Sequence, residues 1–259
     1  MIADLYDDAY ASFACSPTAR HLFGPVLDSA LPAGLEPYSF VTSEMLALVR
    51  TALREIHVDM LVDLGCGRGG PGLWLARELS CALVGVDRSR VAAVEANSRR
   101  SLFPSPAGLG SFVQADMQAL PIRSASVDAV VSIDALQTSE TAELTMGEIS
   151  RILRPGGRFV ATTWQAVDLT DHRVAPRLRV DFQRSATAVG FDKVRIREVQ
   201  TAHEAEMELA RTAVALDPRL VGEELILQRI VSEAVETLTH AGLTRRIILA
   251  ASKPKCCSR

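Results

Sequence analysis

The 259-residue sequence has no apolar run that approaches the roughly 20 residues needed to cross a bilayer. Its first eight residues include three aspartates, and they lack the basic start and the apolar stretch of a secretion signal. The formal net charge is only −3, and no long basic run of the kind that grips nucleic acid is present. We therefore expect a soluble cytoplasmic protein that binds neither a membrane nor a nucleic acid.

Cysteine is also scarce, with five residues and no CxxC pair. The odd number and the missing pairs argue against a structural zinc site and against a disulfide framework, so no metal is expected. Cys81 lies in an apolar run and is predicted to be a small core residue, whereas Cys256 and Cys257 lie in a polar tail.

From residue 56 onward, short apolar runs alternate with helical patterns. One helical face is formed by Met45, Val49 and Leu53, and another by Met146 and Ile149. Strands are predicted over residues 58–64, 81–86, 111–114, 127–133, 158–163, 194–199 and 245–251. This alternation predicts an α/β protein with a Rossmann-like doubly wound sheet that is covered by helices on both faces.

Two segments do not follow the alternation. Residues 1–43 contain Pro and Gly breaks and are predicted to form an N-terminal helical cap. Residues 201–240 have strong helical periodicity and lie between the last two predicted strands, which indicates a helical cap insertion. The remaining residues, 44–200 and 241–259, are assigned to the core, its last strand and the tail.

The most informative segment is a glycine turn between a strand and a helix. Gly65, Gly67 and Gly70 satisfy the GxGxxG pattern of dinucleotide binders, and Gly69 in place of Gly70 gives GxGxG. Without Cβ atoms such a turn can lie close to a ligand and present its N–H groups. The pattern alone fits either a dinucleotide or S-adenosylmethionine as the ligand. It also fits a turn that binds no ligand.

Asp63 separates the two ligands. A carboxylate two residues before the first glycine would repel the pyrophosphate of a dinucleotide, whereas S-adenosylmethionine brings a sulfonium and an ammonium group. Asp87 follows Gly65 by 22 residues, the distance at which a carboxylate accepts hydrogen bonds from ribose hydroxyls. Asp116 can accept from an adenine amino group, and Met117 can pack on its ring. These residues favour S-adenosyl-L-methionine over NAD.

At this point the sequence resembles the class I S-adenosylmethionine-dependent methyltransferases, and in particular the small-molecule enzymes of bacterial secondary metabolism. The resemblance covers residues 40–200 and rests on motifs in the correct order. They are VDLGCGRGGPG (62–72), VGVD (84–87), QADMQALPI (114–122), VDAVVSIDALQ (127–137) and RILRPGGRFVATTW (151–164).

The resemblance implies a mostly parallel seven-stranded sheet whose last strand is antiparallel. It also implies a set of cofactor-binding residues: Thr42, Asp63, Gly65, Cys66, Gly67, Asp87, Arg88, Asp116, Met117 and Ser132. Within this set, the glycines would line the methionine part, and Asp63 would hold its amino group. Thr42 could equally cap the helix that begins after it.

Methyl transfer to an O, N or C atom requires alignment and exclusion of water, and a base only where the acceptor arrives protonated. His172 and Asp134 are the candidate bases, although a surface role for the histidine and a helix cap for the aspartate are simpler interpretations. Gln137 and Trp164 lie at the ends of predicted strands, where substrate pockets form. Tyr38 and Phe40 are added as substrate-pocket candidates, because their segment resembles one that folds over the cofactor.

Three hypotheses remain open at this stage. The first is a small-molecule methyltransferase. The second is a methyltransferase of nucleic acid or protein, which the net negative charge disfavours. The third is a non-methylating member of the fold, either a pericyclic catalyst or a dinucleotide-dependent oxidoreductase. The basic residues between 173 and 197 could meet an anionic substrate, but a solvated surface explains them more simply. The protein could be a monomer or a homodimer.

Overall fold

The computed structural model describes residues 2–108, 110–139 and 141–255. Within these residues, seven strands form one sheet in the order β3-β2-β1-β4-β5-β7-β6. The first five strands are parallel, and β7 runs antiparallel to both of its neighbours. The strands are β1 (Met60–Leu64), β2 (Ala82–Asp87), β3 (Ser111–Gln114), β4 (Val127–Ile133), β5 (Leu153–Ala166), β6 (Asp192–Glu198) and β7 (Thr244–Ser252). Cys256 and Cys257 lie outside the described residues.

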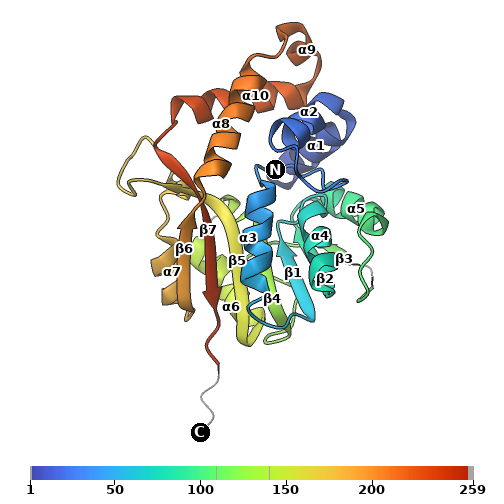
Figure 1. The fold of residues 1–259 in the computed structure, drawn as a ribbon. Helices are drawn as coiled ribbons and strands as arrows, with labels where there is room; N and C mark the ends of the chain where they lie inside the picture. Colours follow the sequence, from blue (N-terminus) through green and yellow to red (C-terminus); the bar gives the residue numbers. More distant parts are fainter. Residues whose placement is uncertain (1, 109, 140, 256–259) are drawn as a thin grey trace.

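Helices cover both faces of this sheet (Figure 1). One apolar cluster joins the sheet to α3, α4 and α5, and a second joins it to α6 and α7. Because both faces are covered, the central strands are nearly continuous runs of buried residues. The helices are α3 (Ser43–Leu53), α4 (Gly70–Leu79), α5 (Arg90–Arg99), α6 (Ala142–Ile152) and α7 (Phe182–Ala188). Short 3-10 turns occur at Arg100–Leu102, Leu136–Thr138 and Pro176–Leu178.

The remaining helices lie together beyond one end of the sheet, at the top of Figure 1. They come from the two ends of the sequence and share a third apolar core, in which Phe13 and Phe23 pack with Leu209, Leu227 and Ile230. The helices are α1 (Ile2–Cys15), α2 (Pro17–His21), a π-helical turn (Leu22–Val26), α8 (Gln200–Val214), α9 (Pro218–Glu223) and α10 (Leu225–Thr239). None of the helices in the described part of the chain is long and apolar enough to cross a membrane.

The predicted fold class is confirmed, including the antiparallel last strand. Strand β5 differs from the prediction because it begins at Leu153 and not at Arg158. The Pro-Gly-Gly segment after α6 does not form a separate turn. It forms an irregularity inside the strand, where the pairing with β4 shifts between Val127 and Ala129. The boundaries of the core and the two caps stay a prediction.

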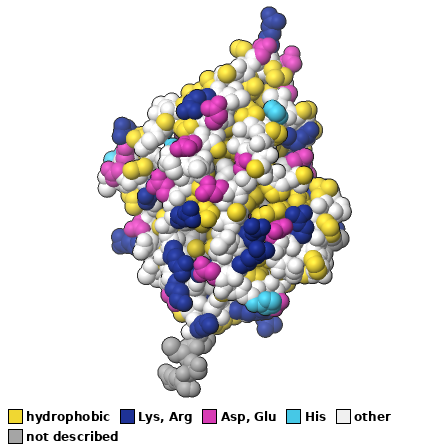
Figure 2. Space-filling model, in the orientation of Figure 1, with side chains coloured by type: hydrophobic (Ala, Val, Ile, Leu, Met, Phe, Trp, Pro, Cys, Tyr) yellow, Lys and Arg dark blue, Asp and Glu magenta, His cyan; other side chains and the backbone are white. Residues whose placement is uncertain are grey.

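The surface carries no single dominant charge on the face that Figure 2 shows, where basic and acidic side chains are interspersed. Two basic residues of β6 form ion pairs with glutamates in and just after α3. Arg195 lies 3.3 Å from Glu55, and Arg197 lies 4.0 Å from Glu44. These contacts support a solvated, ion-paired surface for this part of the predicted basic segment.

Candidate functional site

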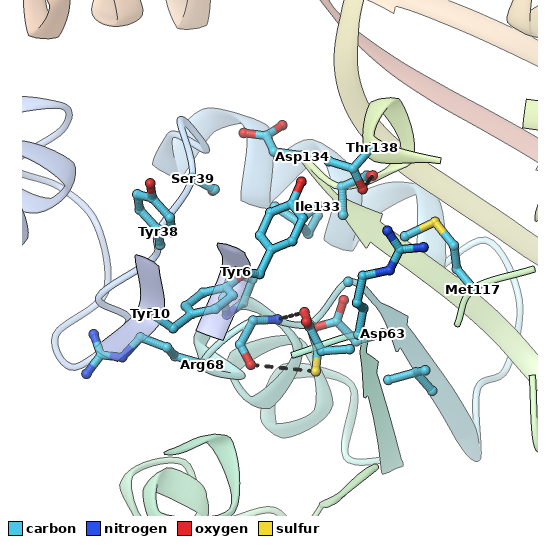
Figure 3. Close-up of a pocket in the computed structure, with 18 of the residues that line it drawn as sticks. Tyr6, Tyr10, Tyr38, Ser39, Asp63, Arg68, Met117, Ile133, Asp134 and Thr138 are labelled. Carbon is cyan, nitrogen blue, oxygen red and sulfur yellow. Dashed lines mark hydrogen bonds between the residues drawn. The ribbon is translucent and has the colours of Figure 1, made fainter. Parts of the chain in front are cut away.

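A cavity opens where the carboxyl ends of β1, β2 and β4 meet, which is the switch point of the doubly wound sheet. Open α/β sheets bind ligands at this place because neighbouring loops diverge there. We call it the strand-end cavity. Its lining includes Tyr6, Tyr10, Asp63, Gly65, Cys66, Gly67, Asp87, Arg88, Asp116, Met117 and Asp134. Most of the predicted cofactor-binding residues therefore lie together (Figure 3).

The turn after β1 leaves no room for a side chain at Gly65 or Gly67. Gly65 has a φ of 68°, and a Cβ atom there would lie 2.2 Å from the Cβ of Ala135. Gly67 has a φ of 50°, and a Cβ atom there would lie 2.8 Å from the Tyr10 hydroxyl. Only glycine adopts such conformations readily, so the turn brings bare backbone to the cavity wall.

Asp63 is buried directly beneath this turn. Burial raises the pKa of Asp63 to about 7, and the nearby charge of Asp87 adds to the shift, whereas a backbone hydrogen bond from Gly72 opposes it. Among the described residues, its Oδ1 atom has no hydrogen-bond partner, although the residue lines the cavity. A buried oxygen of this kind is costly unless a ligand supplies a donor.

Asp87 at the end of β2 supports the turn through both carboxylate oxygens. The Gly67 N–H donates to one oxygen at 2.8 Å, and the Ser89 N–H donates to the other at 2.8 Å. Burial raises the pKa of Asp87, and these two backbone hydrogen bonds oppose that shift. Farther out, Arg88 donates to the exposed Asp116 at 2.9 Å, beside the half-buried Met117.

Helix α1 closes the strand-end cavity on one side. Tyr10 extends from this helix to the glycine turn, and the ring of Tyr6 lies between Tyr10 and Asp134 (Figure 3). The ring of Tyr10 packs edge-on against that of Tyr38 at 5.7 Å between centroids. Burial and the charge of Asp87 raise the pKa of Tyr10 well above its usual range, so the phenol stays protonated. The two tyrosines of α1 were not predicted from the sequence.

A second cavity of about 540 Å³ lies beneath the cap helices. It has the size of a small-molecule site. We call it the cap cavity, and the four predicted substrate residues all line it: Tyr38, Phe40, Gln137 and Trp164. The two cavities share Tyr6, Tyr38, Ser39, Asp134, Thr138 and Ser139, so they meet.

Asp134 lies at this junction and forms a buried ion pair. Arg246 Nη2 lies 2.8 and 2.9 Å from its two carboxylate oxygens, and both side chains are at most 1% exposed. The Thr162 hydroxyl and the Phe40 N–H also donate to the carboxylate, at 2.6 and 3.0 Å. Asp134 itself has a φ of 52°. With its oxygens engaged in this way, the predicted base acts as a structural anchor between β4, β7 and the segment before α3.

Glu206 of α8 is a second buried carboxylate in the cap cavity. The indole Nε1 of Trp164 donates to its two oxygens at 2.8 and 2.9 Å. Burial raises the pKa of Glu206 to about 7, and the guanidinium of Arg246 and the indole N–H oppose that shift. A carboxylate with this pKa can exchange a proton near neutral pH.

Three predicted site residues do not line either cavity. Thr42 is buried and caps α3, because its hydroxyl accepts a hydrogen bond from Met45 N at 3.3 Å. Ser132 is buried within the sheet and donates to the carbonyl of Leu64 at 3.0 Å. His172 is exposed, with its Nδ1 3.0 Å from Arg179 Nη1. The structure therefore places the candidate base His172 away from the cavities.

Arg68 lines the strand-end cavity and interacts with side chains of the chain itself. It pairs with Glu95 at 2.5 Å and with Glu36 at 3.3 Å, and its guanidinium stacks on Phe13. No group of three or more metal-ligating side chains gathers in the part of the chain that the structure describes.

Two comparisons identify the class of this domain. Residues 62–161 match the sequence model of the family described as Methyltransferase domain. The fold is that of the cyclase SpnF, with a TM-score of 0.67 at 22% identity, over 82% of this chain and 80% of that structure. The resemblance to the class I methyltransferases is thereby confirmed for the domain.

Curated relatives are methyltransferases of small or carrier-bound molecules. The sterol 24-C-methyltransferase of Kluyveromyces lactis is 31% identical over 115 residues, which is 44% of this chain and 30% of that protein. The malonyl-acyl-carrier-protein O-methyltransferase of Methylococcus capsulatus is 30% identical over 174 residues, or 61% of this chain and 62% of that protein. The chain thus matches less than a third of the sterol enzyme and less than two thirds of the other.

Proposed function

We propose that this protein transfers a methyl group from S-adenosylmethionine to a small molecule held in the cap cavity. The observation that carries the proposal is the buried Oδ1 of Asp63, which lacks a partner among the described residues and lies beside the glycine turn of a methyltransferase domain. The ammonium group of the methionine moiety is a suitable donor for that oxygen.

The other residues of the strand-end cavity fit the same molecule. The glycines at 65 and 67 allow the methionine part to approach the backbone, and Asp87 lies where ribose hydroxyls would meet a carboxylate. Met117 and the exposed Asp116 would border the adenine. When bound, S-adenosylmethionine supplies a methyl group that its sulfonium makes electrophilic.

The protein's own contribution is alignment and exclusion of water. Tyr6 and Tyr38 stand at the junction of the two cavities, and Phe40 and Trp164 form an aromatic wall beyond it. The rings of Phe40 and Trp164 pack edge-on at 5.6 Å. Such a wall orients an acceptor towards the junction and keeps water out, which are the main requirements of an in-line displacement.

Binding of S-adenosylmethionine at pH 6.5 is expected to release up to about one proton per protein. Asp63 holds its proton up to a pH of about 7 in the free protein, and a neighbouring ammonium group would lower that pKa. The release is measured by calorimetry in buffers of different ionisation enthalpy. Asp63→Asn is the control and is expected to release no proton, whereas a binding heat that is independent of buffer in the wild type would contradict the proposed contact.

A non-methylating catalyst is the second candidate, because one of the similar structures, with a TM-score of 0.67, is the cyclase SpnF. The test is incubation with methyl-labelled S-adenosylmethionine and a panel of small-molecule acceptors. Transfer of label to an acceptor supports the methyltransferase, whereas tight binding with no transfer to any acceptor supports the cyclase type. Secondary metabolism, a cytoplasmic location and the choice between monomer and homodimer stay predictions.

A further inference from the structure

Two buried carboxyl groups, those of Asp134 and Glu206, line the cap cavity, whereas one buried guanidinium, that of Arg246, lies beside it. Arg246 faces two buried carboxylates, Asp134 and Glu206, but forms its ion pair with Asp134. Within the described residues, Glu206 forms no ion pair, and its oxygens accept only from the Trp164 indole in the contacts observed. The guanidinium of Arg246 balances the charge of Asp134. Within the described residues, the carboxylate of Glu206 therefore has no cationic partner of its own.

The other charged groups of the cavity do not balance Glu206. Arg229 pairs with Glu233 at 3.0 Å on α10, and Arg173 pairs with Asp171 at 2.7 Å with a side chain that is 70% exposed. Arg177 lies at the exposed rim. The lining also contains Glu236 and His240 of α10. A cationic ligand group would therefore improve the charge balance at the inner end of the cavity.

The surroundings of Glu206 also favour a cation. Tyr6, Phe23, Tyr38, Phe40 and Trp164 all line the same cavity, and aromatic faces attract cations. Trp164 already stacks on Arg246, whose guanidinium carbon lies 3.8 Å from the ring centroid. A buried carboxylate within an aromatic wall is the combination that recognises an ammonium group.

We propose that the acceptor of this enzyme is an amine, which binds in its protonated form beside Glu206 and gives its proton to that carboxylate. The proposal rests on the proposed function and names the substrate class of the same site. The N–H proton passes to the Glu206 oxygen, which becomes a carboxylic acid. The nitrogen keeps the lone pair that forms the new bond to the methyl carbon, while the sulfur keeps the electrons of the bond that breaks.

The test uses two probes of the same shape, benzylamine and benzyl alcohol, added to the full-length protein at pH 8. The sequence contains only two tryptophans, Trp74 and Trp164, so indole N–H resonances report on the cavity directly. The Trp164 resonance is assigned by its loss in Trp164→Phe. Binding is followed in the wild type, in Glu206→Gln, and in Glu204→Gln, a control that removes an exposed carboxylate from the same helix.

We expect benzylamine to shift the Trp164 resonance and to bind at least 10-fold more weakly to Glu206→Gln than to the wild type. Benzyl alcohol should bind both equally, and Glu204→Gln should behave as the wild type. Equal affinity of the wild type for the two probes would overturn the proposal, and so would unchanged amine binding in Glu206→Gln. If Glu206→Gln does not fold, Glu206→Asp is tested in its place. This variant keeps the charge, so it should still bind benzylamine more tightly than benzyl alcohol, and loss of that preference would overturn the proposal.

A second measurement distinguishes failure of this inference from failure of the proposed function. Calorimetry of S-adenosylmethionine with the wild type reports on the strand-end cavity alone. If that ligand binds and benzylamine does not, only the amine proposal fails. If benzylamine binds through Glu206 and S-adenosylmethionine does not, the proposed function fails while the cation site stands.

Discussion

Replacement of Arg246 by methionine is expected to lower the free energy of unfolding by about 3–5 kcal/mol. The methionine would fill most of the space, but the Asp134 carboxylate would lose the guanidinium that lies 2.8 and 2.9 Å from its oxygens. Because the side chain of Asp134 is 1% exposed, water cannot replace the missing partner. The stack of the guanidinium on Trp164 would also be lost.

Urea unfolding followed by circular dichroism measures this loss. Arg195→Met is the matched control, because its side chain is 62% exposed and its ion pair with Glu55, at 3.3 Å, lies on the surface. The control should change stability by less than about 1 kcal/mol. Adding Asp134→Asn to Arg246→Met should recover part of the loss, since the unpaired charge disappears. A cost below about 1 kcal/mol for Arg246→Met would show that the buried pair is not coupled as described.

Replacement of Asp87 by alanine is expected to weaken binding of S-adenosylmethionine by about 10- to 100-fold, which corresponds to roughly 1–3 kcal/mol. The carboxylate accepts from Gly67 N and Ser89 N, so its removal loosens the glycine turn as well as the proposed ribose site. Calorimetric titration gives the dissociation constant directly.

Asp128→Ala provides a matched control for Asp87→Ala. The Asp128 carboxylate also accepts from two backbone N–H groups, those of Asp59 and Met60, but it lies at the opposite end of β1. A similar loss of stability with unchanged affinity is expected for this variant. Equal affinities of Asp87→Ala and the wild type would remove Asp87 from the site.

The sequence predicts the strand-end cavity well because that cavity is built from short, local motifs. Gly65 and Gly67 are constrained by their own backbone angles. Asp63 and Asp87 lie at the carboxyl ends of strands whose neighbours follow from the alternation of elements. In such a sheet, a residue's place in a strand fixes its place in the site. Eight of the ten predicted cofactor residues therefore line the cavity.

The cap cavity depends on tertiary contacts that no local pattern records. Glu206 lies in a helical stripe of otherwise small or apolar buried residues, and a lone glutamate in such a stripe was the available signal. Arg246 is likewise a charged residue in a buried run, at the first buried position of β7. In contrast, His172 was selected for its chemistry and for its place in the loop after the fifth predicted strand, and the structure exposes it at the surface. The spacing of Tyr6 and Tyr10 by four residues on α1 placed both on one face, but only the packing of that helix shows which cavity they meet.

The most direct test of the account is calorimetric titration of the unmodified protein with S-adenosylmethionine and, separately, with NADH. The buried carboxylate of Asp63 beside the glycine turn predicts that S-adenosylmethionine binds at one site per chain and that NADH does not bind. Binding of NADH without binding of S-adenosylmethionine would contradict the assignment of the cavity.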